Sequence, residues 1–179
     1  SMTAEPAESL DIVVVGDSES YNTVSTMELW EQYGITTFDC GQTGQRIQEA
    51  YYALKTAFRT QSPKLVIVEE ISPFAEIYME KIQKLCDKNG AQILFISAPS
   101  PVNYNGKRLT AVQNYAKELN IPYIDFNSKL DEIGLDWSKD SLDKGDHLNI
   151  FGAKKATEYL GKYLAENYTF EDHRGDTKY

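Results

Sequence analysis

The sequence predicts an α/β fold: a flavodoxin-like, three-layer α/β/α arrangement around a five-stranded parallel sheet. Two observations lead to this prediction. Short apolar runs alternate along the chain with segments of helical periodicity, which is typical of a parallel sheet covered by helices on both faces. The first run, Val13-Val14-Val15, is apolar at every position and stops at Gly16, as expected of a strand that is buried on both faces.

The predicted elements follow in order from these patterns. The strands are short runs rich in Val, Ile, Leu and Phe, at residues 11–15, 35–39, 65–68, 93–96 and 121–126. The helices carry an apolar stripe, at residues 20–33 (after a short loop), 44–60, 73–89, 109–119 and 151–168. We expect Thr43 to cap the second helix, Pro73 to open the third, and Gly34 and Gly90 to end the helices before them. Residues 127–149 break the alternation and are mostly polar.

The composition indicates one globular domain. The chain has 179 residues, of which 41% are hydrophobic and 25% are charged. A formal net charge of -9 argues against nucleic acid or an anionic membrane as a partner, and the absence of a long apolar run argues against membrane insertion. We interpret residues 1–10 as a polar linker or cloning remnant, residues 11–168 as the domain, and residues 169–179 as a polar tail.

Cysteine and histidine usage gives no sign of a metal or cofactor. Cys40 and Cys86 match neither a disulfide scaffold nor a metal-ligand spacing, so we expect two reduced thiols, with a disulfide as the open alternative. The two histidines and the scattered acids show no ligand spacing either. The sequence therefore predicts chemistry carried by side chains alone.

A candidate catalytic group follows the first strand. Gly16-Asp17-Ser18 falls at the carboxyl edge of the predicted sheet, where open α/β folds bind their ligands. A serine hydroxyl needs a base within hydrogen-bonding reach, and that base needs an acceptor on its other nitrogen. His147, just before the last helix, can reach the same edge. His173 is expected to be solvated in the tail, with the alternative that it folds back over the domain together with Arg174. Ser18, His147 and a nearby aspartate are therefore the candidate catalytic residues.

These residues also carry a family resemblance. Gly16-Asp17-Ser18 after the first strand, and the segment Asp143 to Gly152 before the last helix, resemble the SGNH/GDSL hydrolase family over residues 11–168. The second segment is similar to poorly characterised bacterial members that resemble the polysaccharide O-acetylation and D-alanylation proteins. The resemblance implies that Ser18 is the nucleophile and His147 the base. It also implies that the backbone N–H groups of Ser18 and Gly44 bind the oxyanion.

The sequence departs from the family pattern at the acid. The family usually has its acid three residues before the histidine, where this chain has Lys144. Asp143 and Asp146 flank that position. We favour Asp143, which a one-residue adjustment of the loop would bring to His147, and we interpret Asp146 as a structural anion at the start of the last helix.

A second departure concerns the oxyanion and substrate contacts. The family commonly has an asparagine after its third strand, but this chain reads Glu69-Glu70-Ile71-Ser72-Pro73 there. Either Gln42, Gln45 or Asn103 replaces that donor, or only backbone donors remain. Tyr104, in the loop after the fourth strand, is a candidate ligand contact. A carboxylate of Glu69 or Glu70 near the site would repel anionic substrates and favour cationic or neutral ones.

Three functions compete. The first is a serine esterase or O-acyltransferase that acts on O-acyl groups, expected to be acetyl, of a carbohydrate or cell-surface polysaccharide through an acyl-Ser18 intermediate. The resemblance implies an extracytoplasmic bacterial location and a membrane O-acyltransferase as a partner. The alternative is a non-catalytic carbohydrate-binding or assembly domain that retains the fold. A nucleotide-binding domain is the weakest candidate, because the chain has neither a Gly-x-Gly-x-x-Gly nor a Walker motif.

Overall fold

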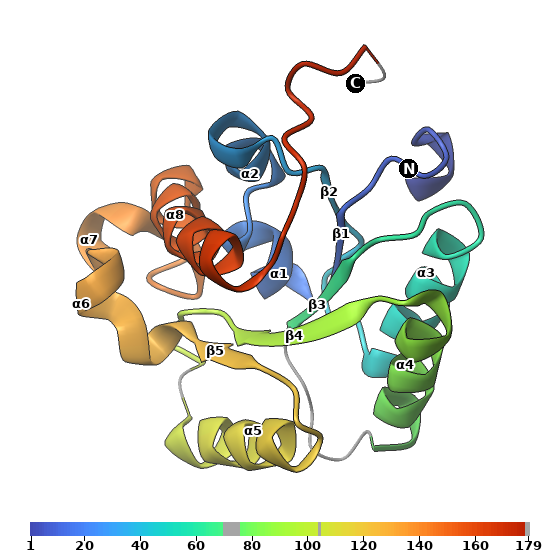
Figure 1. Cartoon of the computed structure of the whole chain (residues 1–179). Coiled ribbons are helices and arrows are strands. Elements are labelled where there is room, and N and C mark those ends of the chain that lie inside the picture. Colours follow the sequence, from blue (N-terminus) through green and yellow to red (C-terminus); the bar gives the residue numbers. More distant parts are fainter. Residues whose placement is uncertain (70–75, 104, 178–179) are drawn as a thin grey trace.

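A single parallel sheet organises the chain (Figure 1). The computed structural model describes residues 1–69, 76–103 and 105–177. The sheet has five strands in the order β2-β1-β3-β4-β5, and every neighbouring pair is parallel. The strands are β1 (Ile12–Val15), β2 (Thr37–Asp39), β3 (Leu65–Glu69), β4 (Gln92–Ser97) and β5 (Tyr123–Asp125). The predicted fold class and flavodoxin-like strand order are therefore confirmed.

Helices cover both faces of the sheet, with α3, α4 and α5 on one side and α1, α2 and α8 on the other (Figure 1). The α-helices are α1 (Ser18–Thr23), α2 (Thr26–Tyr33), α3 (Ile47–Ala57), α4 (Glu76–Asn89), α5 (Gly106–Glu118), α6 (Leu130–Ile133), α7 (Trp137–Asp140) and α8 (Ile150–Asn167). Two 3-10 helices are η1 (Met2–Ala4) and η2 (Phe126–Lys129). The polar stretch before α8 ends in an antiparallel pair, β6 (Ser141–Leu142) and β7 (His147–Leu148).

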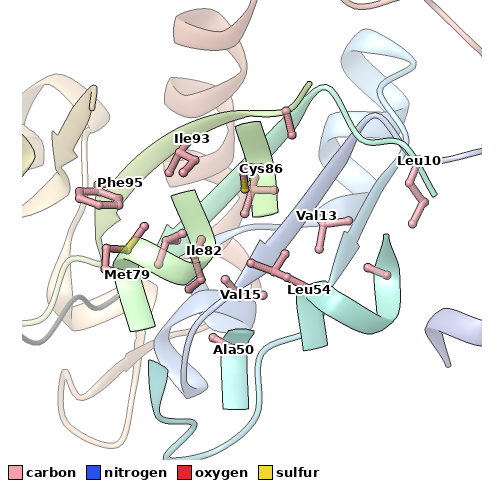
Figure 2. Packing of buried hydrophobic residues seen from close by; sticks show 14 of the residues in the cluster. Leu10, Val13, Val15, Ala50, Leu54, Met79, Ile82, Cys86, Ile93 and Phe95 are labelled. Atoms are coloured by element: carbon pink, nitrogen blue, oxygen red, sulfur yellow. The ribbon is translucent and has the colours of Figure 1, made fainter. Parts of the chain in front are cut away.

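Strand β1 divides the core into two layers. All four of its side chains are fully buried, and they alternate between the two faces of the sheet. Val13 and Val15 pack with Leu54 of α3 and Ile82 of α4, as Figure 2 shows. The other two β1 side chains join the cluster formed with α2 and α8. Burial of each such side chain stabilises the fold by about 1.5–3 kcal/mol, so β1 is fixed from both sides.

Several helix boundaries differ from those predicted. Thr43 does not cap α3; the N-cap is Arg46, whose backbone N–H donates to Glu49 Oε2 at 2.7 Å. The helix ends at Ala57 rather than near residue 60. The predicted opening of the next helix at Pro73 lies outside the described residues. Helix α1 begins at Ser18 itself, so this serine lies in the first turn of a helix rather than in a loop.

The C-terminal tail folds back onto the amino edge of the sheet. His173 Nε2 lies 3.1 Å from Asp11 Oδ2, and its Nδ1 lies 2.8 Å from Asp176 Oδ2. The backbone N–H of His173 donates to Gly34, and the Arg174 side chain donates to the carbonyl of Glu31. We call residues 172–176 the C-terminal latch. The preferred expectation of a solvated His173 is wrong, because its side chain is only 13% exposed, and the alternative of a tail folded back over the domain is the one found.

Two further observations concern the chain as a whole. Cys40 and Cys86 are both free thiols, and burial raises the pKa of each to about 12. Among the residues described, we find no helix of the length and apolar character that crossing a membrane requires.

Candidate active site

Ser18 is held at the junction of β1 and α1. Asp17 is the N-cap of α1 and accepts a hydrogen bond from the backbone N–H of Glu19 at 2.8 Å. Gly16 is required because the Glu69 side chain crosses it: a Cβ there would lie 2.7 Å from Glu69 Cβ. Ser18 is the first helical residue, and its N–H is among those that a helix start leaves without an intrahelical acceptor.

The loop after β2 packs directly against this turn. The backbone N–H of Gln42 donates to the Gly16 carbonyl at 3.2 Å. A side chain at Gly41 would overlap the Ser20 hydroxyl, so only glycine permits the approach. The backbone around Ser18 is therefore fixed by a neighbouring loop as well as by its own helix.

His147 reaches Ser18 from the opposite end of the chain. Its Nε2 lies 2.9 Å from Ser18 Oγ, across a separation of 129 residues. The histidine sits on β7, where it pairs with Leu142 of β6, and its side chain is 18% exposed. The next helix is capped by Asn149, which accepts from the first N–H groups of α8. Strand pairing and a helix cap thus place the imidazole.

Two aspartates approach the other nitrogen of His147. Asp143 Oδ2 lies 3.3 Å from Nδ1, within hydrogen-bonding distance, whereas Asp146 Oδ2 lies at 3.7 Å. Asp146 Oδ1 instead accepts from the Asn103 side chain at 2.7 Å. Asp146 is not the anion that starts the last helix, because Asn149 fills that position. The geometry favours Asp143 as the partner of His147.

The loop that carries Asp143 adopts an uncommon backbone conformation, which brings this residue to His147. Asp143, Lys144 and Gly145 have φ values of 50°, 60° and 101°, which form a continuous left-handed run. Non-glycine residues are strained there, and such strain persists only where surrounding contacts hold it. Pro101 is one such contact, because it packs where a side chain at Gly145 would lie. The run turns Asp143 back toward the imidazole.

The side chains expected to replace the missing asparagine are bound elsewhere. The Gln45 amide oxygen accepts from the Gly16 N–H at 3.2 Å, and its NH₂ donates to the Cys40 carbonyl at 2.9 Å. The Asn103 NH₂ donates to Glu19 Oε1 at 3.0 Å in addition to Asp146. Neither amide is therefore directed at a developing oxyanion.

The remaining predicted contacts are less defined. Gly44 is exposed, with φ of 67°, and Gln42 is exposed too; neither lines the cavity beside Ser18. Tyr104 lies outside the described residues. The predicted role of the Gly44 N–H as an oxyanion donor therefore stays a prediction, as does that of the Ser18 N–H.

A cavity of about 300 Å³ opens beside Ser18 and His147. It lies at the carboxyl edge of β3 and β4, which is where the sequence predicts a ligand crevice. Its walls include Glu19, Glu69, Ser97, Ala98, Leu109 and Val112. The α5 residues Leu109 and Val112 were not predicted, because their spacing is equally that of an ordinary buried helix face.

Two carboxyl groups in this cavity are strongly perturbed. The exposed fractions of Glu19 and Glu69 are 7% and 4%. Burial raises the pKa of Glu19 to about 7, partly offset by its hydrogen bond with Asn103. Burial also raises the pKa of Glu69 well above its usual range, and the charges of Asp17 and Glu19 add to that effect. Glu19 was missed in the sequence, although its position directly after the serine is a usable signal.

Within residues 1–69, 76–103 and 105–177, no group of three or more His, Cys, Asp or Glu is arranged to hold a metal ion.

Comparison with known proteins identifies the fold. No protein-family model matches the sequence, and no curated protein matches it. Several solved structures, in contrast, do match this chain. A candidate SGNH hydrolase from Slackia heliotrinireducens is 13% identical, with a TM-score of 0.65 over 87% of this chain and 98% of its own. A lipase/acylhydrolase from Enterococcus faecalis is 12% identical, with a TM-score of 0.64 over 90% of this chain and 99% of its own.

A GDSL-like lipase from Bacteroides thetaiotaomicron is 14% identical, with a TM-score of 0.59 over 87% of each chain. At these identities the similarity is one of fold. The protein therefore has the fold of the SGNH/GDSL hydrolases, as its sequence predicted.

Proposed function

We propose that this protein is a serine esterase that cleaves an O-acyl ester through an acyl-Ser18 intermediate. The observation that carries the proposal is the 2.9 Å contact between Ser18 Oγ and His147 Nε2 at the carboxyl edge of the sheet. A serine with only a structural role in this turn would not need a histidine side chain at hydrogen-bonding distance. The solved structures named as lipases and acylhydrolases, which share the fold, support the same reaction class.

The chemistry follows from the order of the three side chains. Ser18 Oγ attacks the ester carbonyl carbon while His147 Nε2 takes the hydroxyl proton, and Asp143 accepts from Nδ1–H and supports the imidazolium. The tetrahedral intermediate collapses as the alcohol leaves with the proton from Nε2. Water then attacks the acyl-serine, His147 takes its proton, and the carboxylic acid leaves as Ser18 recovers its hydrogen. We assign the Ser18 N–H, in the first turn of α1, as the proposed donor to the oxyanion.

The substrate is proposed to be a short acyl ester, with acetyl as the first candidate and a carbohydrate as the alcohol. A cavity of about 300 Å³ supports a small substrate group beside the serine. The carbohydrate is supported by the sequence resemblance to bacterial members linked to polysaccharide O-acetylation. If a sugar hydroxyl replaces water in the second step, the same acyl-enzyme makes the protein an acyltransferase.

Covalent labelling tests the activated serine directly. The folded protein should react with a fluorophosphonate, and mass spectrometry should locate the adduct on Ser18. Labelling should be lost in Ser18→Ala and in urea-unfolded protein. Ser97→Ala is the matched control, because Ser97 lines the same cavity but its hydroxyl is bonded to Tyr123 rather than to a histidine. An unmodified Ser18 in the folded protein would sink the proposal.

One observation favours a second candidate, a carbohydrate-binding or assembly domain without catalysis. The amides of Gln45 and Asn103 are engaged elsewhere, so the proposed oxyanion site rests on backbone donors. Glycan binding that is unchanged by Ser18→Ala, together with no turnover of 4-nitrophenyl acetate by the native protein, would select this candidate. Turnover that disappears in Ser18→Ala would exclude it.

A further inference from the structure

We propose that the cavity beside Ser18 binds an ammonium group of the substrate, held by the carboxylates of Glu19 and Glu69. The inference rests on the proposed esterase function and specifies its substrate class: an ester that carries a positively charged nitrogen. The nitrogen can belong to the acyl part or to the alcohol part, and the experiment below separates these two sources.

The first support is the charge of the cavity wall. Among the described residues, the acids that line it are Asp17, Glu19, Glu69 and Asp146, and the basic residues are Arg108 and His147. A concave wall of one predominant sign attracts the opposite charge, and its low-dielectric surroundings strengthen that attraction. The buried pair, Glu19 and Glu69, have raised pKa values, and a cation beside them would favour their charged forms.

The second support is independent of the count of acids. Glu19 Oε2 and Glu69 Oε2 are buried, and neither has a hydrogen-bond partner in the part of the chain that the structure describes. Glu19 Oε1, in contrast, accepts from Asn103. A buried polar atom without a partner is costly, and a buried charge without one more so. Backbone hydrogen bonds from Ala98 and Asp17 also reach the Glu69 carboxyl group. One oxygen of each carboxyl group therefore still lacks a donor, and a ligand could supply it.

An organic ammonium fits this position better than a metal ion. Among the described residues, these acids do not converge on a point from which three or more could bind one ion. Leu109, Val112 and Ala98 place apolar surface on the same cavity wall. Carbon atoms next to a nitrogen can pack on that surface while the charge meets the carboxylates.

A competing arrangement also accounts for the two carboxyl oxygens that lack hydrogen-bond partners. Both glutamates would keep their protons and donate hydrogen bonds to a neutral, oxygen-rich substrate. Glutamine separates the two arrangements, because its amide keeps a donor and the shape of the side chain but cannot carry the negative charge. A site for a cation fails with glutamine, whereas a site for a neutral acceptor tolerates it.

The experiment compares two pairs of esters that differ only in charge. Acetylcholine and 3,3-dimethylbutyl acetate place the cation, or its neutral replacement, in the alcohol. The 4-nitrophenyl esters of 3-aminopropanoate and butanoate place it in the acyl group. The native protein should prefer the cationic member of one pair by about tenfold or more in kcat/KM, the scale of a close charge pair. The pair that shows the preference identifies the part of the ester that enters the cavity.

Variants then assign the preference to the two carboxylates. Glu19→Gln and Glu69→Gln should each bring the ratio of cationic to neutral kcat/KM close to one. Glu118→Gln removes the same charge from the exposed end of α5 and should leave the ratio unchanged. A preference that survives both cavity variants overturns the proposal, as does a native preference for the neutral esters. Because Glu69 is only 4% exposed, Glu69→Gln can disrupt the fold, and Glu19→Gln is then the decisive variant.

Binding without turnover distinguishes this proposal from the esterase itself. In Ser18→Ala, calorimetry should detect choline or 3-aminopropanamide but not the neutral 3,3-dimethylbutanol or butanamide. Addition of Glu19→Gln should remove that binding. If the cation binds but no ester is cleaved by the native protein, the esterase fails and the cation site stands. If neutral esters are cleaved and neither cation binds, the esterase stands and the cation site fails.

Discussion

The two histidines of this protein occupy similar surroundings at opposite edges of one sheet. His147 lies at the carboxyl edge and His173 at the amino edge, and two aspartates approach each ring. Their side chains are 18% and 13% exposed, so burial does not separate them. The difference lies at Nε2, which meets the Ser18 hydroxyl in one case and the Asp11 carboxylate in the other.

That single partner decides what each ring can do. A carboxylate on both nitrogens favours the charged imidazolium, and the pKa of His173 is raised accordingly, first by Asp176 and then by Asp11. A hydroxyl on Nε2 lets that nitrogen accept a proton while Nδ1 donates to an aspartate. The comparison teaches that the partners of the ring, not the histidine or its burial, distinguish a candidate base from a structural cation.

The largest expected effect is on turnover. His147→Ala should lower kcat/KM for 4-nitrophenyl acetate by about 10³-fold or more, because the proposed nucleophile loses its base. His173→Ala is the matched control and should leave turnover within about threefold, because His173 lies at the opposite edge of the sheet from Ser18 and contacts Asp11 instead. If the two variants lose kcat/KM equally, the assignment of His147 as the base and His173 as a structural residue is wrong.

The next effect separates the two aspartates beside His147. Asp143→Asn should lower kcat by about 10²-fold or more, because an amide cannot support the imidazolium or hold the Nδ1–H tautomer. Asp146→Asn should cost less than about tenfold, since its main contact is with Asn103. Initial rates across pH 6–9 for both variants give the comparison. A larger loss for Asp146→Asn would reverse the assignment.

A smaller effect concerns stability. His173→Ala should lower the free energy of unfolding by about 1–2 kcal/mol, because the latch loses its hydrogen-bonded contacts with Asp11 and Asp176. Urea unfolding followed by circular dichroism measures this value. His147→Ala should lower the free energy of unfolding by less, because its carboxylate partner Asp143 is 69% exposed whereas Asp11 is 8% exposed. If His147→Ala lowers the free energy of unfolding more than His173→Ala does, the stabilising role assigned to His173 in the latch is wrong.

The smallest effect is the pH dependence of that stabilisation. The folded pKa of His173 is raised above its ordinary value of 6.5, so protonation favours the folded state. The difference in unfolding free energy between the native protein and His173→Ala should therefore be full below pH 6.5. It should decrease as the pH rises through the folded pKa. A difference that grows between pH 6 and pH 9 would contradict this sign.

The sequence predicts the sheet well and the loops poorly, for a physical reason. Val13 to Val15 and Leu65 to Val68 are apolar at every position because both faces of the sheet are covered, and that local pattern survives in the structure. The same holds for the placement of Gly16-Asp17-Ser18 at the strand end. Such features depend on residues adjacent in the chain.

The features that were missed depend on distant residues. The left-handed run through Asp143 and Lys144 is held by contacts such as that of Pro101 with Gly145, which no local pattern records. The engagement of Gln45 with Gly16 is likewise long-range. So is the docking of His173 on Asp11, where the sequence offers a folded-back tail only as an alternative. The perturbed Glu19 follows the same rule, because its burial is set by elements far along the chain.

The separation of 129 residues between Ser18 and His147 has a consequence for synthesis in the cell. The proposed nucleophile leaves the ribosome early, whereas its base is made only shortly before α8. Under the proposed function, a nascent or truncated chain that lacks the segment from β6 onward carries an inert serine. Ester turnover would then report the completion of folding. The late synthesis of the base would also protect cellular esters from partly made chains.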